Sequence, residues 1–167
     1  CRAYYVYSME VHGDYLYAVS YYGHSVFRVH TTTGVCDYSE RVRYAYNLAI
    51  GNNKLYAFGR WRNYTTWNLS GAKPSKISCS VSVNYWLYYE SGSAVDPSGN
   101  YYYAAYGRQL YRHKIDNNGC ITNSYSVATL NSTYFNRAAI RFHPTNDNIL
   151  YAASMFRHRL TKITFSI

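Results

Sequence analysis

The chain has 167 residues, of which 48% are hydrophobic and 15% charged, so it can bury a core and is not intrinsically disordered. No apolar stretch approaches the roughly 20 residues that a membrane-spanning helix needs. The 17 lysines and arginines outnumber the 8 acidic residues and give a net charge of +9, so the chain is clearly basic.

A short apolar segment built around Leu-Tyr-Ala, preceded by a polar turn, recurs four times. Its anchoring tyrosines are Tyr17, Tyr56, Tyr103 and Tyr151, which are 39, 47 and 48 residues apart. A period of this length with β-type patterning is typical of a β-propeller, in which each repeat forms one four-stranded blade. No segment shows helical periodicity or helix caps, so we expect an all-β chain.

Each repeat contains several short apolar or alternating segments that predict strands. The first repeat predicts strands at residues 9–11, 15–18, 26–30 and 35–36, and the second at 48–50, 55–57, 65–69 and 77–83. The third repeat predicts strands at 94–95, 101–104, 110–115 and 120–127, and the fourth at 139–142, 149–152 and 160–165. Glycines such as Gly34 and Gly119 mark the turns before the outermost strands.

The fourth repeat ends without a fourth strand, whereas residues 1–5 resemble the segments that begin at Cys36, Cys79 and Cys120. We therefore expect the N-terminal segment to complete the last blade and to close a four-bladed ring, which removes free sheet edges. The expected single domain has blades at residues 8–43, 46–88, 92–130 and 137–167, the last completed by 1–5. The alternative is an open array, or half of a larger ring made by two chains.

The four cysteines, Cys1, Cys36, Cys79 and Cys120, each lie near the start of an outermost strand. Equivalent points on the rim of a ring are farther apart than the ~7 Å between Cα atoms that a disulfide allows. We therefore expect small buried packing residues, with disulfides between chains as the alternative. There is no Cys-x-x-Cys and no paired histidine spacing, so no metal is expected.

The chain starts at cysteine rather than methionine, which favours a processed, secreted, extracellular protein. Glycosylation sequons begin at Asn63, Asn68 and Asn131, and they permit glycosylation without arguing for it.

The functional hint is the abundance of tyrosine, which occurs 23 times, together with arginine. Both residue types are favoured at binding surfaces. On one face of a propeller, the loops between second and third strands should lie beside those between blades. The first set contributes the candidates Tyr22, His24, Arg60, Trp61, Arg62, Tyr106, Arg108, Phe156, Arg157 and His158. The second set, at residues 4–7, 41–46, 85–90 and 134–137, contributes Arg43, Trp86 and Arg137.

An aromatic and basic face of this kind suits carbohydrates, because sugar C–H patches lie on rings and anionic groups bind arginine. Repeated sites would make binding multivalent. The sequence thus predicts a secreted, lectin-like protein with glycans or glycoconjugates as partners and a homo-oligomer left open. Nucleic acid would fit the same chemistry but not a secreted protein. The alternative is a tyrosine-rich structural, adhesive or protein-interaction propeller, whose aromatic side chains fill gaps between the blades.

A catalytic function is not expected. The acids are scattered, and no Ser-His-Asp spacing or Gly-x-Ser-x-Gly motif is present. Glu10 and Asp96 lie near the expected ring axis, where some propellers hold calcium, but the equivalent positions around Ala49 and Arg141 add no acid. We expect a protein that is not an enzyme and needs no cofactor.

Two segments carry a family resemblance. Residues 94–104, with the sequence AVDPSGNYYYA, resemble the NHL-type propeller repeat, and residues 142–151 are similar to it. The Leu-Tyr strands also resemble the repeats of YWTD propellers. The resemblance implies a propeller fold but no particular function. Related propellers generally have five or more blades, so a chain of four repeats is short for this group.

Overall fold

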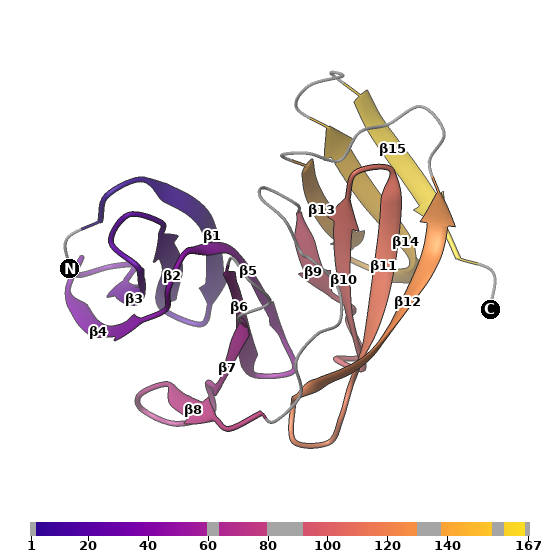
Figure 1. The fold of residues 1–167 in the computed structure, drawn as a ribbon. Coiled ribbons are helices and arrows are strands. Elements are labelled where there is room, and N and C mark those ends of the chain that lie inside the picture. Colours follow the sequence, from indigo (N-terminus) through magenta and orange to yellow (C-terminus); the bar gives the residue numbers. More distant parts are fainter. Residues whose placement is uncertain (1–2, 60–63, 80–91, 130–137, 155–158, 166–167) are drawn as a thin grey trace.

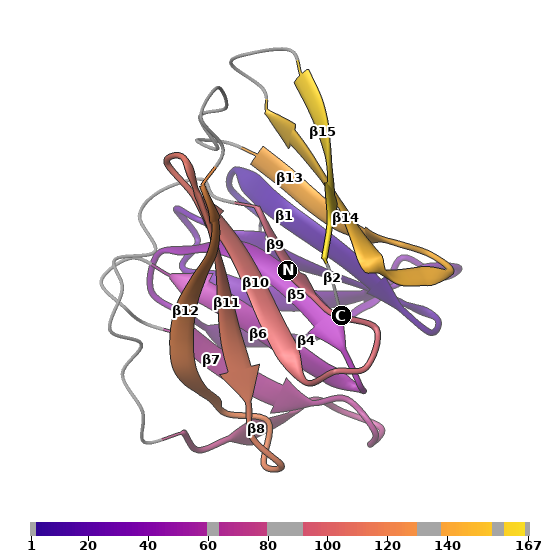
Figure 2. The ribbon, with the colours of Figure 1, turned by 90° about the vertical axis from the view of Figure 1, so that its right-hand side faces the viewer.

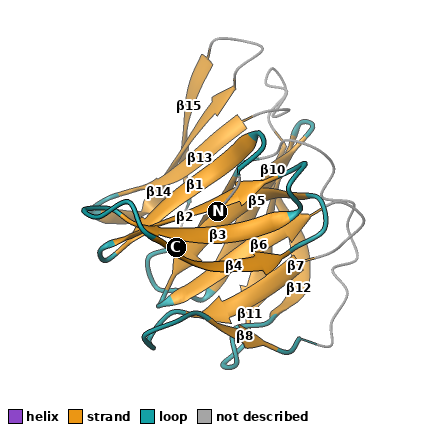
Figure 3. Cartoon of the chain, turned by 90° about the vertical axis from the view of Figure 1, so that its left-hand side faces the viewer, coloured by secondary structure: helices purple, strands orange, loops and turns teal. Residues whose placement is uncertain are grey.

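The computed structural model describes residues 3–59, 64–79, 92–129, 138–154 and 159–165. In these residues the chain forms strands, turns and loops (Figure 3). None of them belongs to a helix that could span a membrane.

The strands form four antiparallel sheets in chain order, one for each sequence repeat (Figure 1). The first sheet contains β1 (Val6–His12), β2 (Tyr15–Ser20), β3 (Ser25–His30) and β4 (Cys36–Arg41). The second contains β5 (Ala45–Gly51), β6 (Lys54–Gly59), β7 (Tyr64–Asn68) and β8 (Ser75–Ile77). The third contains β9 (Ser93–Val95), β10 (Tyr101–Tyr106), β11 (Gln109–Ile115) and β12 (Ile121–Thr129). The fourth contains β13 (Ala138–His143), β14 (Asn146–Ser154) and β15 (Arg159–Thr164).

The chain is therefore an all-β, four-bladed β-propeller, as the repeat spacing predicts. We number the blades in the order of the sheets. Each blade runs from an inner strand to an outer one by short antiparallel connections, because the polar turns of the repeats join neighbouring strands. The outer strand of blade 1 extends well beyond the predicted residues 35–36, since β4 continues to Arg41 in an alternating pattern.

The prediction that the N-terminal segment pairs with blade 4 is wrong for Tyr4 and Tyr5. The Tyr4 amide donates to Ser20 Oγ at 3.0 Å, and Ser20 Oγ donates back to the Tyr4 carbonyl at 2.6 Å. The Tyr21 amide donates to the Tyr5 carbonyl at 3.2 Å. These hydrogen bonds join Tyr4 and Tyr5 to residues of blade 1 that lie close in sequence. Forming them therefore closes a much shorter loop than pairing with β15 would.

The core lies between the blades. One cluster joins blades 1 and 2 through residues such as Val26 and Leu48, which are 0% and 1% exposed. A second joins blades 2 and 3 through Phe58 and Tyr102, whose rings stack at 4.2 Å. A third joins blades 3 and 4 and includes Leu110. Each blade therefore buries one sheet face against the next blade, which is how strands with two apolar faces become stable in a propeller.

The inner strands β1, β5, β9 and β13 are tied together by polar contacts around the axis, and they gather in the middle of Figure 2. Ser8 Oγ accepts a hydrogen bond from the Leu48 amide at 3.1 Å, and Ser93 Oγ donates to the Leu48 carbonyl at 3.2 Å. Arg141 donates to the Ser93 carbonyl at 3.3 Å. The same guanidinium forms an ion pair with Glu10 at 2.6 Å, which links the first and last blades.

Burial raises the pKa of Glu10, and the positive charge of Arg141 opposes this effect. The predicted position of Glu10 near the axis is thus correct. The positive charge beside it, rather than a second carboxylate, explains why this place is unsuited to a calcium ion.

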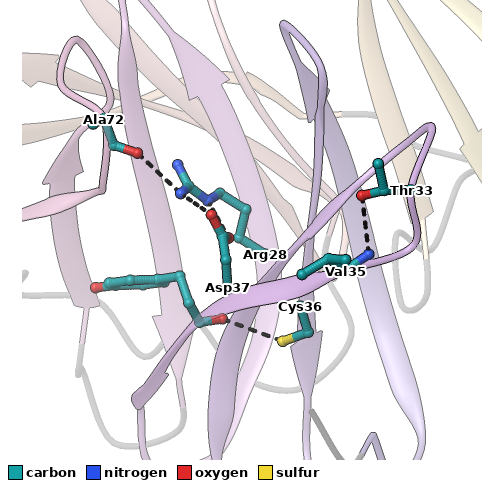
Figure 4. A network of polar contacts seen from close by, with 7 residues as sticks. Arg28, Thr33, Val35, Cys36, Asp37 and Ala72 are labelled. Atoms are coloured by element: carbon teal, nitrogen blue, oxygen red, sulfur yellow. Dashed lines mark hydrogen bonds and ion pairs between the residues drawn. The ribbon is translucent and has the colours of Figure 1, made fainter.

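A buried arginine links blades 1 and 2 (Figure 4). Arg28 in β3 has only 3% of its side chain exposed, and its Nε and Nη2 atoms donate to the Asp37 carboxylate at 2.8 and 2.5 Å. Nη2 also donates to the Ala72 carbonyl of blade 2 at 3.0 Å. The guanidinium carbon lies 4.0 Å from the centre of the Tyr15 ring. The buried charge is thus neutralised, hydrogen-bonded and stacked, as its low exposure requires.

The prediction that the cysteines form no disulfide within the chain is wrong. Cys79, after β8, is bonded to Cys120, just before β12, with 5.5 Å between their Cα atoms. The rims of blades 2 and 3 are close at this point, since Cys120 Sγ also lies 3.9 Å from the Ser78 carbonyl oxygen. The turn before Cys120 packs on blade 2, where a Cβ on Gly119 would meet the Lys54 side chain. Cys36 is disulfide-bonded as well.

A histidine in blade 3 predicts a pH-dependent stability. His113 in β11 is 0% exposed, and burial lowers its pKa to about 4. In the unfolded chain its pKa is about 6.5, so the unfolded state binds more protons between these values. The contribution of neutral His113 to the free energy of unfolding is complete above about pH 6.5 and is lost progressively as the pH falls towards 4. Urea unfolding between pH 7.5 and 4.5 should show a steeper loss of stability in the parent than in His113→Gln; equal slopes would contradict this.

Candidate functional site

Seven aromatic side chains gather where the turn between β2 and β3 meets the connection between β4 and β5. We call this group the tyrosine cluster: Tyr5, Tyr7, Tyr21, Tyr22, His24, Tyr44 and Tyr46. It combines one loop between second and third strands with one loop between blades. These are the two kinds of loop that the sequence predicts to share a face.

Tyr21 is the centre of the cluster. Its ring stacks on Tyr46 with the centroids 4.5 Å apart, and it meets Tyr7, Tyr22 and Tyr44 at 4.9 to 5.5 Å. Most of the other contacts are edge-to-face, including Tyr5 on Tyr22 at 5.2 Å. Such arrangements are the favoured geometries of aromatic pairs, so the rings hold one another in place.

Ser20 fixes the backbone beneath the cluster. Its hydroxyl is 0% exposed; it bonds both polar backbone atoms of Tyr4 and accepts from the Gly23 amide at 3.2 Å. This side chain therefore ties the N-terminal segment to the turn between β2 and β3. The Tyr21 amide adds a further bond to the Tyr5 carbonyl.

His24 joins the two loops. Its carbonyl accepts from the Val42 amide at 2.8 Å, and its Nδ1 atom accepts from the Tyr44 amide at 3.3 Å. A neutral imidazole whose Nδ1 accepts carries its proton on Nε2. The ring also lies edge-on to Tyr44 at 4.5 Å. His24 therefore has a positioning role in the cluster as well as being a candidate contact residue.

The backbone of the cluster is held in an uncommon conformation. Tyr5, His24 and Tyr44 have φ values of 54°, 48° and 53°, in the left-handed region that bulky residues avoid. Gly59 makes the Tyr44 conformation possible, since a Cβ there would lie 2.6 Å from the Arg43 carbonyl oxygen. Backbone strain of this kind is concentrated at binding and catalytic sites.

The cluster is open to solvent on its outer side. Tyr5, Tyr7 and Tyr22 are 72%, 44% and 61% exposed, whereas Tyr46 is only 5% exposed. The exposed Arg43 places its guanidinium carbon 5.4 Å from the centre of the Tyr44 ring. The surface thus offers ring faces, phenolic hydroxyls and one cation on a fixed base. It can stack on a planar or C–H-rich ligand and donate hydrogen bonds to it.

The structure brings three of the predicted site residues, Tyr22, His24 and Arg43, to one place. Arg108 is exposed in the turn between β10 and β11, and Tyr106 ends β10, so both belong to blade 3 and not to the tyrosine cluster. The remaining candidates lie outside the described residues: Arg60, Trp61, Arg62, Trp86, Arg137, Phe156, Arg157 and His158.

The site residues predicted from the sequence do not include Tyr5, Tyr7, Tyr21, Tyr44 and Tyr46, although four of these lie in the loop segments at residues 4–7 and 41–46. A usable signal was present, because Tyr21-Tyr22 is one of several adjacent tyrosine pairs. What the sequence could not show is that the N-terminal segment folds back onto the turn after β2. That contact depends on the buried hydroxyl of Ser20.

In the part of the chain that the structure describes, no group of three or more His, Cys, Asp or Glu side chains could hold a metal ion.

Comparisons with solved structures support the fold. The chain is similar to a protein in the crystal structure of a nidogen–laminin complex, with a TM-score of 0.67 and 11% identity over 95% of this chain and 60% of the other. It is also similar to a putative 6-phosphogluconolactonase from Bacteroides uniformis, with a TM-score of 0.66 and 14% identity over 96% and 50%. A third match is the computationally designed Ika4 protein, with a TM-score of 0.60 and 10% identity over 97% of this chain and 92% of the other.

At identities this low, the structural similarity establishes the β-propeller fold alone and not a function. The chain spans about half the length of the two natural proteins, 60% and 50%, although almost all of this chain is matched. No protein-family model matches the sequence, and no curated protein matches it either.

Proposed function

We propose that the protein is a secreted carbohydrate-binding propeller that takes glycans on the tyrosine cluster. The observation that carries the proposal is the set of rings held rigidly yet exposed, with Arg43 beside them. A binding surface of tyrosines loses little side-chain entropy on contact, because each ring has few rotatable bonds and is already fixed by its neighbours.

The chemistry favours sugars, and anionic sugars in particular. Pyranose rings present C–H patches that pack on aromatic faces, and their hydroxyls find partners in the phenolic groups. A sulfate or carboxylate on the sugar would pair with Arg43, and the net charge of +9 would attract it from a distance. Multivalency would follow if the related loops of the other blades bind in the same way.

The Cys79–Cys120 bond supports the secreted location, because disulfides persist in oxidising compartments and are rare in the cytosol. No cysteine in the described residues is free.

A protein ligand is the second candidate. Exposed tyrosines with arginine are also typical of protein interfaces. The similar propeller in the nidogen–laminin structure occurs in a protein complex. The two candidates differ in one measurement: a soluble sugar competes with a glycan ligand but not with a protein interface.

A double variant tests the site. Tyr22→Ala with Arg43→Ala should weaken binding to immobilised sulfated and neutral glycans about 10- to 100-fold. It removes one exposed ring and one charge-assisted contact, together on the order of 1–3 kcal/mol. Binding of acidic glycans by the parent should also weaken with added salt, because exposed charges are screened.

The matched control is Tyr125→Ala, which removes a tyrosine that is 51% exposed on β12 of blade 3, outside the cluster. Circular dichroism and thermal melting should be the same for all three proteins. If the double variant binds as the parent does, the cluster is not the site. If the parent binds no glycan on a broad array, the carbohydrate proposal fails and the protein-ligand candidate replaces it.

A further inference from the structure

The two ends of the blade series expose apolar positions that are buried in the interior blades. Strand register identifies Met9, Leu48, Ser93 and Ile140 as equivalent inner-strand residues, because they pair with Ala18, Ala57, Ala104 and Ala152. Leu48, Ser93 and Ile140 are 1%, 4% and 0% exposed, whereas Met9 is 55% exposed. Val11, two residues further along β1, is 62% exposed.

Blade 4 shows the same contrast on its other face. Strand register identifies four equivalent residues near the start of the third strands, Val26, Tyr64, Leu110 and Leu160. They pair with Val19, Phe58, Ala105 and Ala153. Val26 and Leu110 are 0% exposed, and Tyr64 is partly buried. Leu160 is 71% exposed, the largest difference among the four.

These two exposed faces are complementary. Within the chain, Val26 of blade 1 shares a core cluster with Leu48 of blade 2, and Leu110 of blade 3 shares one with Ile140 of blade 4. If blade 4 packed on a following blade in the same way, Leu160 would contact the residue equivalent to Leu48. In blade 1 that residue is Met9. Since both side chains are exposed, blades 1 and 4 of the same chain do not pack against each other at these two positions.

We propose that a second copy of this chain covers both faces, with Leu160 of each copy packed on the Met9 and Val11 surface of the other. The contact is head-to-tail, and two copies related by a two-fold axis form it twice and close the assembly. This chain covers only 60% and 50% of two natural proteins that it matches. Two copies joined in this way would form one ring of eight blades.

The ion pair between Glu10 of β1 and Arg141 of β13 links the same two end blades. It holds the inner strands β1 and β13 within reach of each other, so a second copy would require this contact to lengthen or open. The Arg141 side chain is 56% exposed and Glu10 19%, so water partly screens the ion pair, and the pair contributes little compared with two apolar faces removed from water. Arg141→Ala should therefore leave the dimer intact.

Sedimentation velocity at micromolar concentrations should give a species of twice 19.4 kDa for the parent. Leu160→Asp and Met9→Lys, each tested alone, should raise the dimer dissociation constant about 100-fold, because each places a charge in both apolar contacts. Val35→Asp is the matched control, since Val35 is 56% exposed but lies in the turn before β4. Circular dichroism reports on folding, which these exposed positions should not affect.

Mixing the two variants distinguishes this arrangement from others. In a head-to-tail pair of one Leu160→Asp copy and one Met9→Lys copy, one contact carries both changes with opposite charges and the other contact is unchanged. The mixture should dimerise more tightly than either variant alone. A parent that is monomeric at every concentration overturns the proposal. A dimer that is indifferent to both variants, or two variants that do not complement each other, overturns it as well.

Discussion

Replacing Cys79 and Cys120 together by serine is expected to lower the free energy of unfolding by about 4 kcal/mol. The bond closes a loop with a sequence separation of 41 residues. The chain-entropy estimate for a loop of this size is on the order of 4 kcal/mol, because the unfolded chain without the bond has many more conformations. For a domain of this length, the melting temperature should fall by roughly 8–16 °C, as calorimetry would show.

The double change avoids leaving a reactive free thiol. Its matched control is Ser78→Ala, which alters an exposed residue next to Cys79 and should change stability by no more than about 0.5 kcal/mol. Reduction of the parent with a thiol reagent should lower the melting temperature at least as much as the double variant does. A double variant with the same melting temperature as the parent would show that the bond between blades 2 and 3 does not stabilise the fold.

Asp37→Ala is expected to destabilise the protein by about 3 kcal/mol. The change leaves the Arg28 guanidinium buried without a carboxylate partner; the Ala72 carbonyl, the Tyr15 ring and the Tyr17 hydroxyl remain beside it. Removing one partner of a buried ion pair costs about 3–5 kcal/mol, and the lower figure applies because Asp37 is 31% exposed. Urea unfolding at pH 7 would measure this difference.

The loss should depend on pH with a definite sign. The hydrogen bond from Arg28 holds the pKa of Asp37 below its ordinary value. The stabilisation by this pair is therefore complete above the unfolded pKa of about 3.9 and is lost as the pH falls through the lowered value. Parent and variant should converge in strongly acidic solution. As a control, Asp147→Ala removes an exposed carboxylate of β14 and should be nearly neutral; a similar loss in both variants would contradict the role of the pair.

The elements that the sequence predicts well are those governed by local patterning. The spacing of Tyr17, Tyr56, Tyr103 and Tyr151 and the two-residue alternation beside them predict four sheets in chain order. Polar turns, glycines and alternating side chains act over a few residues, so their effect can be recognised without the rest of the chain. The same local reasoning placed Tyr22, His24 and Arg43 on loops of one face, where the structure brings them together.

Contacts between distant segments followed from tertiary structure alone. No sequence pattern predicted that the N-terminal segment would bond to the buried hydroxyl of Ser20 instead of pairing with blade 4, or that Cys79 would reach Cys120. Both depend on where a short strand ends and how neighbouring blades are inclined. The number of blades follows from the repeated pattern, whereas the exposure of Met9 and Leu160 is seen only in the folded chain. It depends on the packing angles between successive blades, and no single residue encodes their sum.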